Sequence, residues 1–426
     1  MRPLAPASTP PPPSRGLSLL VTLLLAAWAL GTAASEGLLQ VAADATILCA
    51  LVLLALGKAK VAEDLRAPLW AGGLLALYQA LSPLLVHLSG GVAWPPTGKW
   101  LQCLDTAAAP ALVVAASLGV RWTAVEIAAV AGWTGSVALG LVQHFFRWET
   151  PMPEVLHLPV GRVHEVFAPE GRPRFAAGGF FFHRLRFAHG AVALLGPSLS
   201  AALAAASARR RWLGAWMALL CVLAVYLSFA RAALGASVLV GAAAGLALSR
   251  GLARRAGLAG LVLLMVAVAL APGWRLRLAD AGDNVFDGER AQARAAGWDL
   301  VKRQPLLGVG FGNYHAAALA RSADTGLPPQ LARDAHAVWL TVWAETGLLG
   351  LGLWLVWQVL LALALFRRAR LGLWPATGAL LSFLAFHALA LVHHLPFHSS
   401  VHLTFALVFG VGLVYAPEGP EPSTRR

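Results

Sequence analysis

The feature that most constrains this chain is a succession of apolar runs, each about 20 residues long, along most of its 426 residues. A helix needs roughly 20 apolar residues to cross the hydrocarbon core of a bilayer. Only 12% of the residues are charged and 58% are hydrophobic, whereas a soluble domain carries about 25% charged residues. A fold this apolar cannot hide its surface from water. We therefore expect an all-α polytopic membrane protein.

Hydropathy predicts twelve transmembrane helices. Their approximate limits are 16–34, 38–57, 67–89, 101–120, 122–142, 190–207, 212–230, 232–249, 256–272, 338–366, 373–393 and 399–416. They divide the chain into a disordered lead (1–15), a five-helix part (16–142), a first loop (143–189), spans six to nine (190–272), a large loop (273–335), spans ten to twelve (336–416) and a tail (417–426).

Short basic connections indicate how the spans are oriented. Lysine and arginine accumulate in the cytoplasmic loops of multi-pass proteins. With a cytoplasmic N-terminus, the short basic connections all fall on the inner side, and they contain Lys58, Lys60 and Arg66, then Arg121, then Arg209, Arg210 and Arg211, then Arg250, Arg254 and Arg255, then Arg367, Arg368 and Arg370. We therefore expect cytoplasmic termini and two long periplasmic loops in an inner membrane. The same placement explains the net charge of +13 without nucleic-acid binding.

Candidate catalytic side chains gather on the outer side. His336 stands where the large loop meets the next span, and histidine titrates close to neutral pH, which suits a general base; a histidine that only caps a helix is the competing interpretation. Arg231, at the outer end of two spans, needs a partner, a cavity or the interface, because an arginine at membrane depth costs ~2.5–3.5 kcal/mol. Residues 291–303 have helical spacing and end before Gln304–Pro305, a helix stop. Arg290 and Arg294 are one helical turn apart, so they either hold one anion or form a solvated helix face.

The end of the first loop, GFFFHRLRFAH (179–189), interleaves aromatic and basic side chains. His183, Arg184, Arg186 and His189 fit a contact zone for a lipid headgroup or a sugar phosphate. An ordinary aromatic belt with basic anchors explains the pattern nearly as well. Three acidic residues near span ends, Asp44, Asp105 and Glu126, are candidates for pairing with basic residues.

Three further patterns favour structural roles. The run GVGFG (308–312) superficially resembles a nucleotide-binding loop, but no strand precedes it and the full GxGxxG is missing. A turn with close backbone approach is the favoured interpretation. The histidines at 393, 394, 398 and 402 have neither acidic nor cysteine partners in the pattern, so a metal site is not favoured. The three cysteines, at 49, 103 and 221, are expected as buried small hydrophobes.

Four stretches, taken in order, resemble the O-antigen ligase and O-antigen polymerase family of bacterial membrane glycosyltransferases. They are GFFFHRLRFAH (179–189), SFAR (228–231), the R-x-x-x-W of Arg294 to Trp298 running into QPLLGVGFGNY, and HAVWLTVWAETGLLG (336–350). The resemblance covers roughly residues 175–365. It implies a GT-C-like helical bundle with a long periplasmic loop and a glycan donor on undecaprenyl diphosphate. It also implies that neither a metal nor a nucleotide sugar nor another cofactor is used.

The resemblance also implies roles for particular residues. His336 would take the proton from the acceptor hydroxyl, while Arg231 and Arg294 would hold the diphosphate, assisted by Arg290. Direct attack would invert the anomeric carbon. Further contacts with substrate are expected from His183, Arg184, Arg186, His189 and Trp298. The chain departs from the family where it has Ala337 in place of a frequent asparagine, and Ala-Arg-Ala (230–232) in place of a frequent Ser-Arg-Gly.

Three functions are compatible with these features. An O-antigen ligase would transfer the finished glycan to lipid A core. A polymerase for O-antigen or exopolysaccharide would transfer it to another glycan by the same chemistry. A flippase or transporter would line its midplane with polar groups and often shows inverted repeats. Here the charges gather on the outer side and no repeat is visible, which favours the two glycosyltransferases over transport. Sequence patterns separate ligase from polymerase poorly, and the ligase is the first hypothesis.

Overall fold

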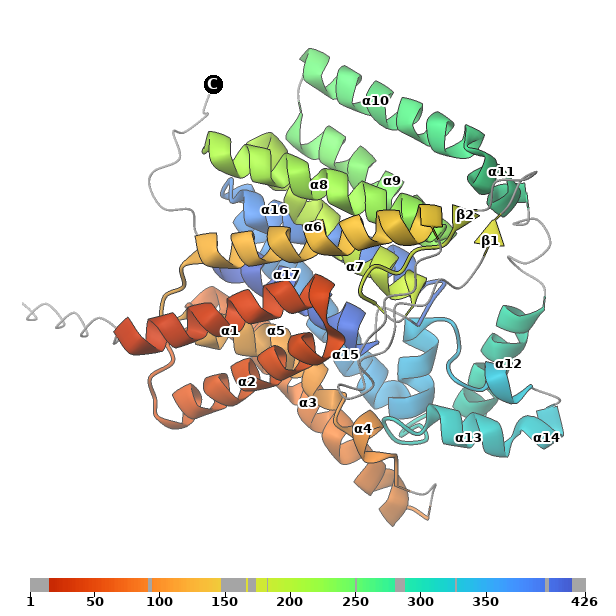
Figure 1. Cartoon of the computed structure of the whole chain (residues 1–426). Helices are drawn as coiled ribbons and strands as arrows, with labels where there is room; N and C mark the ends of the chain where they lie inside the picture. Colours follow the sequence, from red (N-terminus) through yellow and green to blue (C-terminus); the bar gives the residue numbers. More distant parts are fainter. Residues whose placement is uncertain are drawn as a thin grey trace, which may run out of the picture.

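The computed structural model describes residues 15–90, 94–146, 166–167, 174–181, 183–249, 251–279, 288–325, 328–394 and 398–415 (Figure 1). The described chain is helical except for two strands of two residues each, β1 (Val166–Phe167) and β2 (Arg174–Phe175), which pair antiparallel. Residues 1–14 of the predicted lead, the predicted tail 417–426 and most of the first loop lie outside the described residues.

Each of the twelve predicted spans coincides with one helix. The helices are α1 (Arg15–Ala34), α2 (Glu36–Ala55), α3 (Glu63–Leu88), α5 (Cys103–Ala116), α6 (Trp122–Phe146), α7 (Arg184–Ala204), α8 (Ala208–Ser228), α9 (Arg231–Leu248), α10 (Gly251–Leu270), α15 (Val338–Arg370), α16 (Trp374–Ala390) and α17 (Ser399–Val414). Within the described residues, eight of them are long and apolar enough to cross a membrane, and α16 and α17 are shorter apolar helices. The chain is therefore a helical multi-pass membrane protein, and the number twelve stays a prediction.

The large loop is also helical over much of its length. It contains α11 (Pro272–Ala279), α12 (Glu289–Arg303), α13 (Tyr314–Ala320), α14 (Ser322–Thr325) and a 3-10 turn (Pro329–Leu331). The predicted helix over 291–303 is confirmed, because α12 ends at Arg303. Figure 1 shows α12, α13 and α14 together beyond one end of the bundle. A four-residue helix, α4 (Thr97–Trp100), lies in the connection between α3 and α5.

Helix α7 begins at Arg184, earlier than the predicted start of span six at 190. The reason is a cap: Nδ1 of His183 accepts a hydrogen bond from the backbone N–H of Leu185 at 3.2 Å, which satisfies a free donor of the first turn. The first loop, predicted as 143–189, thus has six residues of α7 at its end and four residues of α6 at its start. Arg184 and Arg186 stand in the first turn of a helix.

The centre of the bundle is α7, which packs against α8, α9, α16 and α17 (Figure 1). Small residues allow the close approach that helices in a membrane need. A side chain at Gly196 of α7 would collide with the backbone of Gly378 of α16. Between the same helices, Ser382 donates to the carbonyl of Ala193 at 2.6 Å. Helices α7 and α16 are thus closely packed against each other.

Consecutive helices alternate in direction, so the short basic turns share one end of the bundle, here called the arginine-rich end. Contacts between the turns support this arrangement. Ser18, near the start of α1, donates to the carbonyl of Gly119 in the turn before α6 at 3.0 Å, and Arg368 of α15 donates to Asp64 of α3 at 3.3 Å. The large loop and the predicted catalytic residues lie at the opposite end, called the loop end.

Candidate functional site

His336 occupies a strained backbone position between the large loop and α15. Its φ is +51°, in the left-handed region that costs a non-glycine residue about 1–2 kcal/mol. Asp334 stabilises this turn, since its Oδ1 accepts from the backbone N–H of His336 at 2.8 Å. The same oxygen lies 3.8 Å from Nδ1 of the His336 ring. The ring is about one-third exposed.

Arg231 is the first residue of α9, and the chain reverses direction just before it. Phe229 ends α8 in the left-handed conformation, with φ +52°. Buried Arg184 holds this corner from α7, because its Nη1 donates to the carbonyls of Ser228 at 3.1 Å and Phe229 at 3.4 Å. Arg184 and Arg231 thus start two neighbouring helices at the loop end. The guanidinium of Arg184 therefore holds the backbone of this corner in place through hydrogen bonds.

Arg294 joins α12 of the large loop to the bundle. Its Nη2 donates to the carbonyl of Leu391 at 3.3 Å, just after α16 ends. Its Nε is buried and has no hydrogen-bond partner in the described part of the chain. Arg290 lies one turn earlier on the same helix. The arginine pair predicted from its spacing therefore reaches the connection between α16 and α17, which carries several histidines.

His393 in this connection lies among four basic residues from three parts of the chain: α7, α12 and the turn before α15. Burial holds the pKa of His393 well below its ordinary value, and His189, Arg290, His336 and Arg184 add to the lowering. The rings of His189 and His393 are 5.3 Å apart. His393 is therefore neutral near pH 7 and can accept or donate a hydrogen bond. Its position links the catalytic candidate His336 to the arginines of α7 and α12.

His394 and His398 belong to the same group of histidines, and His394 interacts with His336. Burial lowers the pKa of His394, which also interacts with Asp334, Lys99 and His336. Burial lowers the pKa of His398 to about 3, and Arg186 and Lys99 contribute next. Lys99 was not predicted, because it lies on α4, far along the chain from the recognised stretches. Only the folded chain brings it beside these histidines.

Three residues predicted to contact substrate have partners within the protein. His183 caps α7, as described above. Arg186 donates through Nη1 to both oxygens of Glu36, at 2.8 and 2.7 Å. Trp298 packs edge-on against Trp339 and Trp343 of α15 and is 38% exposed. These contacts explain why such residues stand there, and their contact with substrate stays a prediction.

His189 is completely buried in α7, and neither of its ring nitrogens has a hydrogen-bond partner among the described residues. The ring of His393 lies beside it, with 5.3 Å between the ring centroids. A buried polar group without a partner costs about 1–3 kcal/mol. His189 therefore lies behind the site, where it touches His393, and does not itself reach an open surface.

The glycine-rich run after α12 (308–312) packs against a break in α15, a contact here called the clasp. Gly347, with φ +66°, interrupts that helix. There the backbone N–H of Gly310 donates to the carbonyl of Glu345 at 2.8 Å, and that of Leu348 donates to the carbonyl of Pro305 at 2.8 Å. A side chain at Gly308 would meet the Glu345 backbone. The predicted turn with close backbone approach is confirmed, and this packing leaves no cradle for a dinucleotide.

The acidic residues near the span ends divide into two kinds. Glu126 of α6 pairs with Arg210 of α8 at 3.3 Å, as predicted. Asp44 and Asp105 instead share the side-chain amide of Gln40, at 3.1 and 3.2 Å. The three cysteines are free, and two of them are buried. No group of three or more His, Cys, Asp or Glu side chains suited to a metal occurs in the described ranges.

Residues 216–355 match the sequence model of the O-antigen ligase family. This part of the chain is an O-antigen ligase domain. The family is shared by O-antigen ligases and polymerases, which are membrane glycosyltransferase-like enzymes that use lipid-linked glycans. The domain runs from α8 to α15 and contains three of the four recognised stretches; the one at 179–189 precedes it. It includes Arg231, Arg290, Arg294 and His336. No curated protein matches the chain.

Proposed function

We propose that the chain is an O-antigen ligase. In this proposal it transfers a glycan from undecaprenyl diphosphate to a hydroxyl of lipid A core, on the periplasmic side of the inner membrane. The observation that supports it is the placement of His336. Its ring, on a strained turn held by Asp334, adjoins a cluster of arginines and neutral histidines drawn from α7, α12 and the α16–α17 connection. Backbone strain of this kind often occurs where a side chain must be aimed.

The chemistry needs one base and several cations. Nε2 of His336 takes the proton of the acceptor hydroxyl as its oxygen bonds to the anomeric carbon. The bond from that carbon to the diphosphate breaks at the same time, and the electron pair leaves with the diphosphate. Attack from the opposite face inverts the anomeric carbon. Asp334 lies close enough to Nδ1 to stabilise the positive charge that the ring gains.

The arginines supply the charge that the leaving group requires. A diphosphate gains negative charge as it departs, and fixed guanidinium groups stabilise that charge without reorganisation. Arg231 and Arg294 are the proposed ligands, with Arg290 beside Arg294. Guanidinium remains charged at any physiological pH and binds phosphate oxygens in pairs. Since the diphosphate is a good leaving group, positioning and charge neutralisation supply most of the rate.

Surface glycans from a deletion strain test the proposal. Full-length polymer stranded on undecaprenyl diphosphate, together with bare lipid A core, is the result expected for a ligase. Core that bears a single repeat would instead identify a polymerase, the second function that the same domain supports. Unchanged lipopolysaccharide would contradict both and would point to another polysaccharide or to transport.

A further inference from the structure

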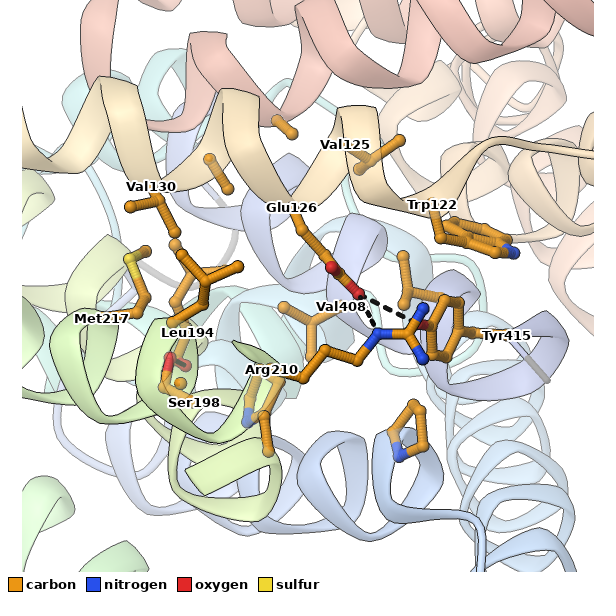
Figure 2. A pocket seen from close by; sticks show the side chains of 18 of the residues that line it. Trp122, Val125, Glu126, Val130, Leu194, Ser198, Arg210, Met217, Val408 and Tyr415 are labelled. Atoms are coloured by element: carbon orange, nitrogen blue, oxygen red, sulfur yellow. Dashed lines mark hydrogen bonds and ion pairs between the residues drawn. The ribbon is translucent and has the colours of Figure 1, made fainter. Parts of the chain in front are cut away.

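A cavity at the arginine-rich end of the bundle lies far from the candidate catalytic site. It has a volume of about 150 Å³ and is enclosed by α1, α6, α7, α8, α16 and α17. Figure 2 shows Val130, Leu194, Met217 and Val408 directed into it. The lining is apolar almost throughout. A cavity of about this size takes a benzene molecule in another protein, so it has room for roughly six carbons of a chain.

Two polar contacts between α6 and α8 frame this cavity. Nearer the helix ends, Nε of Arg210 lies 3.3 Å from Glu126, whose Oε1 also accepts from the hydroxyl of Tyr415 at 2.9 Å. Deeper in the bilayer, the indole N–H of Trp216 donates to the hydroxyl of Thr134 at 3.1 Å. The two contacts are eight residues apart on α6 and six residues apart on α8. These separations correspond to about 12 and 9 Å along the helix axes. The two helices therefore leave a window between these contacts.

The surroundings of the window are those of a lipid-facing surface. Ile127 on α6 is 47% exposed, and Trp212 and Trp216 on α8 are 78% and 45% exposed. At the end nearer Arg210, Trp122 and Trp374 each pack edge-on against Tyr415, and Trp374 and Tyr415 are buried. An occupant of the cavity therefore comes from the bilayer, with its tail inside and its polar end level with Arg210.

Charge at the mouth indicates which lipid fits. Arg210 uses Nε for Glu126, while Nη1 and Nη2 have no hydrogen-bond acceptor among the described residues. Arg209 is exposed beside it, and Arg211 keeps its charge while donating to the carbonyls of Ala205 and Ala206. Of these three consecutive arginines, Arg210 is the one paired with the Glu126 carboxylate, so the start of α8 carries an excess of positive charge. Basic pockets at the ends of transmembrane helices attract anionic headgroups.

We propose that the window between α6 and α8 is a binding site for an anionic phospholipid. One acyl chain enters the cavity, and the phosphate lies against the outward nitrogens of Arg210 and against Arg209. The bound lipid fills a space that side chains leave empty and holds α6 to α8. This site is independent of the transfer reaction, because it lies at the other end of the bundle from His336.

Native mass spectrometry of the purified whole protein tests this, with phosphatidylglycerol and phosphatidylcholine as probes. The wild type should bind its first phosphatidylglycerol about fivefold more tightly than phosphatidylcholine. Ala129→Phe, which fills the cavity, should remove that molecule. Ala215→Phe, on the exposed face of α8, is the matched control and should retain it. A second cavity of about 450 Å³ lies beside Lys60 and Arg66, and none of the substituted residues lines it. Lipid bound there should contribute equally to the wild type and to every variant.

A double variant keeps the test decisive if Ala129→Phe does not fold. Glu126→Gln with Arg210→Gln removes both charges together, so neither is left unpaired, and the cavity keeps its shape. Because this variant keeps Arg209, its preference for phosphatidylglycerol should fall and not vanish. Equal binding of both lipids by the wild type would overturn the proposal, and so would an unchanged preference for phosphatidylglycerol in either the Ala129→Phe or the double variant.

Discussion

Asp334 contacts His336 twice: its Oδ1 accepts from the backbone N–H at 2.8 Å and lies 3.8 Å from Nδ1 of the ring. The first contact fixes the left-handed turn that aims the ring. The second separation exceeds a hydrogen bond, so the carboxylate acts on the ring through its charge. These two effects can be separated by substitution.

Asp334→Asn keeps an oxygen for the backbone N–H and removes the charge. We expect glycan transfer to fall at least about tenfold, since a protonated His336 would lose its counter-charge, while thermal stability changes little. Asp334→Ala removes both contacts and should also lower the melting temperature. Measured rates and melting curves of the two variants distinguish the effects, and full activity in Asp334→Asn would show that the charge is unnecessary.

Arg231→Lys should be severely impaired in transfer. A lysine ammonium is a single point of charge and cannot hold two phosphate oxygens in one plane. We expect a loss of about 10²-fold or more with normal abundance of the protein in the membrane. Arg303→Lys is the control, because Arg303 pairs with Asp299 on the surface of α12 at 3.1 Å. Equal activity of both variants would contradict a diphosphate ligand at Arg231.

Gly347→Ala should destabilise the clasp between the large loop and α15. Its φ of +66° is unfavourable for alanine, and the added Cβ would collide with the carbonyl of Leu306. Strain of this kind costs about 1–3 kcal/mol before the collision is counted. Gly352→Ala lies on the same helix with open space around it and should leave stability unchanged or slightly raised. Thermal unfolding in detergent compares the two, and similar melting temperatures would refute the clasp.

Acid should destabilise the protein partly through His398. Burial lowers the pKa of His398 to about 3 in the folded chain, whereas an unfolded histidine titrates near 6.5. The unfolded chain therefore binds more protons between these values, so stability is fully present above about pH 6.5 and falls as the pH drops toward 3. In His398→Asn the decline of melting temperature over this range should be shallower. An identical slope would mean that His398 is not held neutral.

The sequence predicted the parts of this structure that depend on local pattern. Hydropathy located twelve helices, because a membrane span is a continuous apolar run, and the end of α12 followed from Gln304–Pro305. Arg290 and Arg294 were found from their spacing on one helix. By contrast, Lys99 and the carbonyl of Leu391 reach the site only when α4 and the α16–α17 connection fold against the loop. No spacing along the chain reports such contacts.

Several partners of the predicted residues are distant in sequence, and the sequence did not identify them. Arg186 was expected at a substrate or a headgroup, and it pairs with Glu36, 150 positions away. Trp298 belongs to the family-like R-x-x-x-W stretch, and it packs α12 onto α15. The pairing of Glu126 with a basic residue was predicted from its depth in the bilayer, but not the identity of the partner, Arg210. Such pairs are set by tertiary packing.

A transfer assay with purified protein, undecaprenyl-diphosphate-linked glycan and lipid A core tests whether His336 is the base. His336→Ala should lose transfer by about 10²- to 10⁴-fold, while its melting temperature and its abundance in the membrane remain close to those of the wild type. Wild-type rates of transfer in that variant would contradict the role of His336 and the mechanism that depends on it.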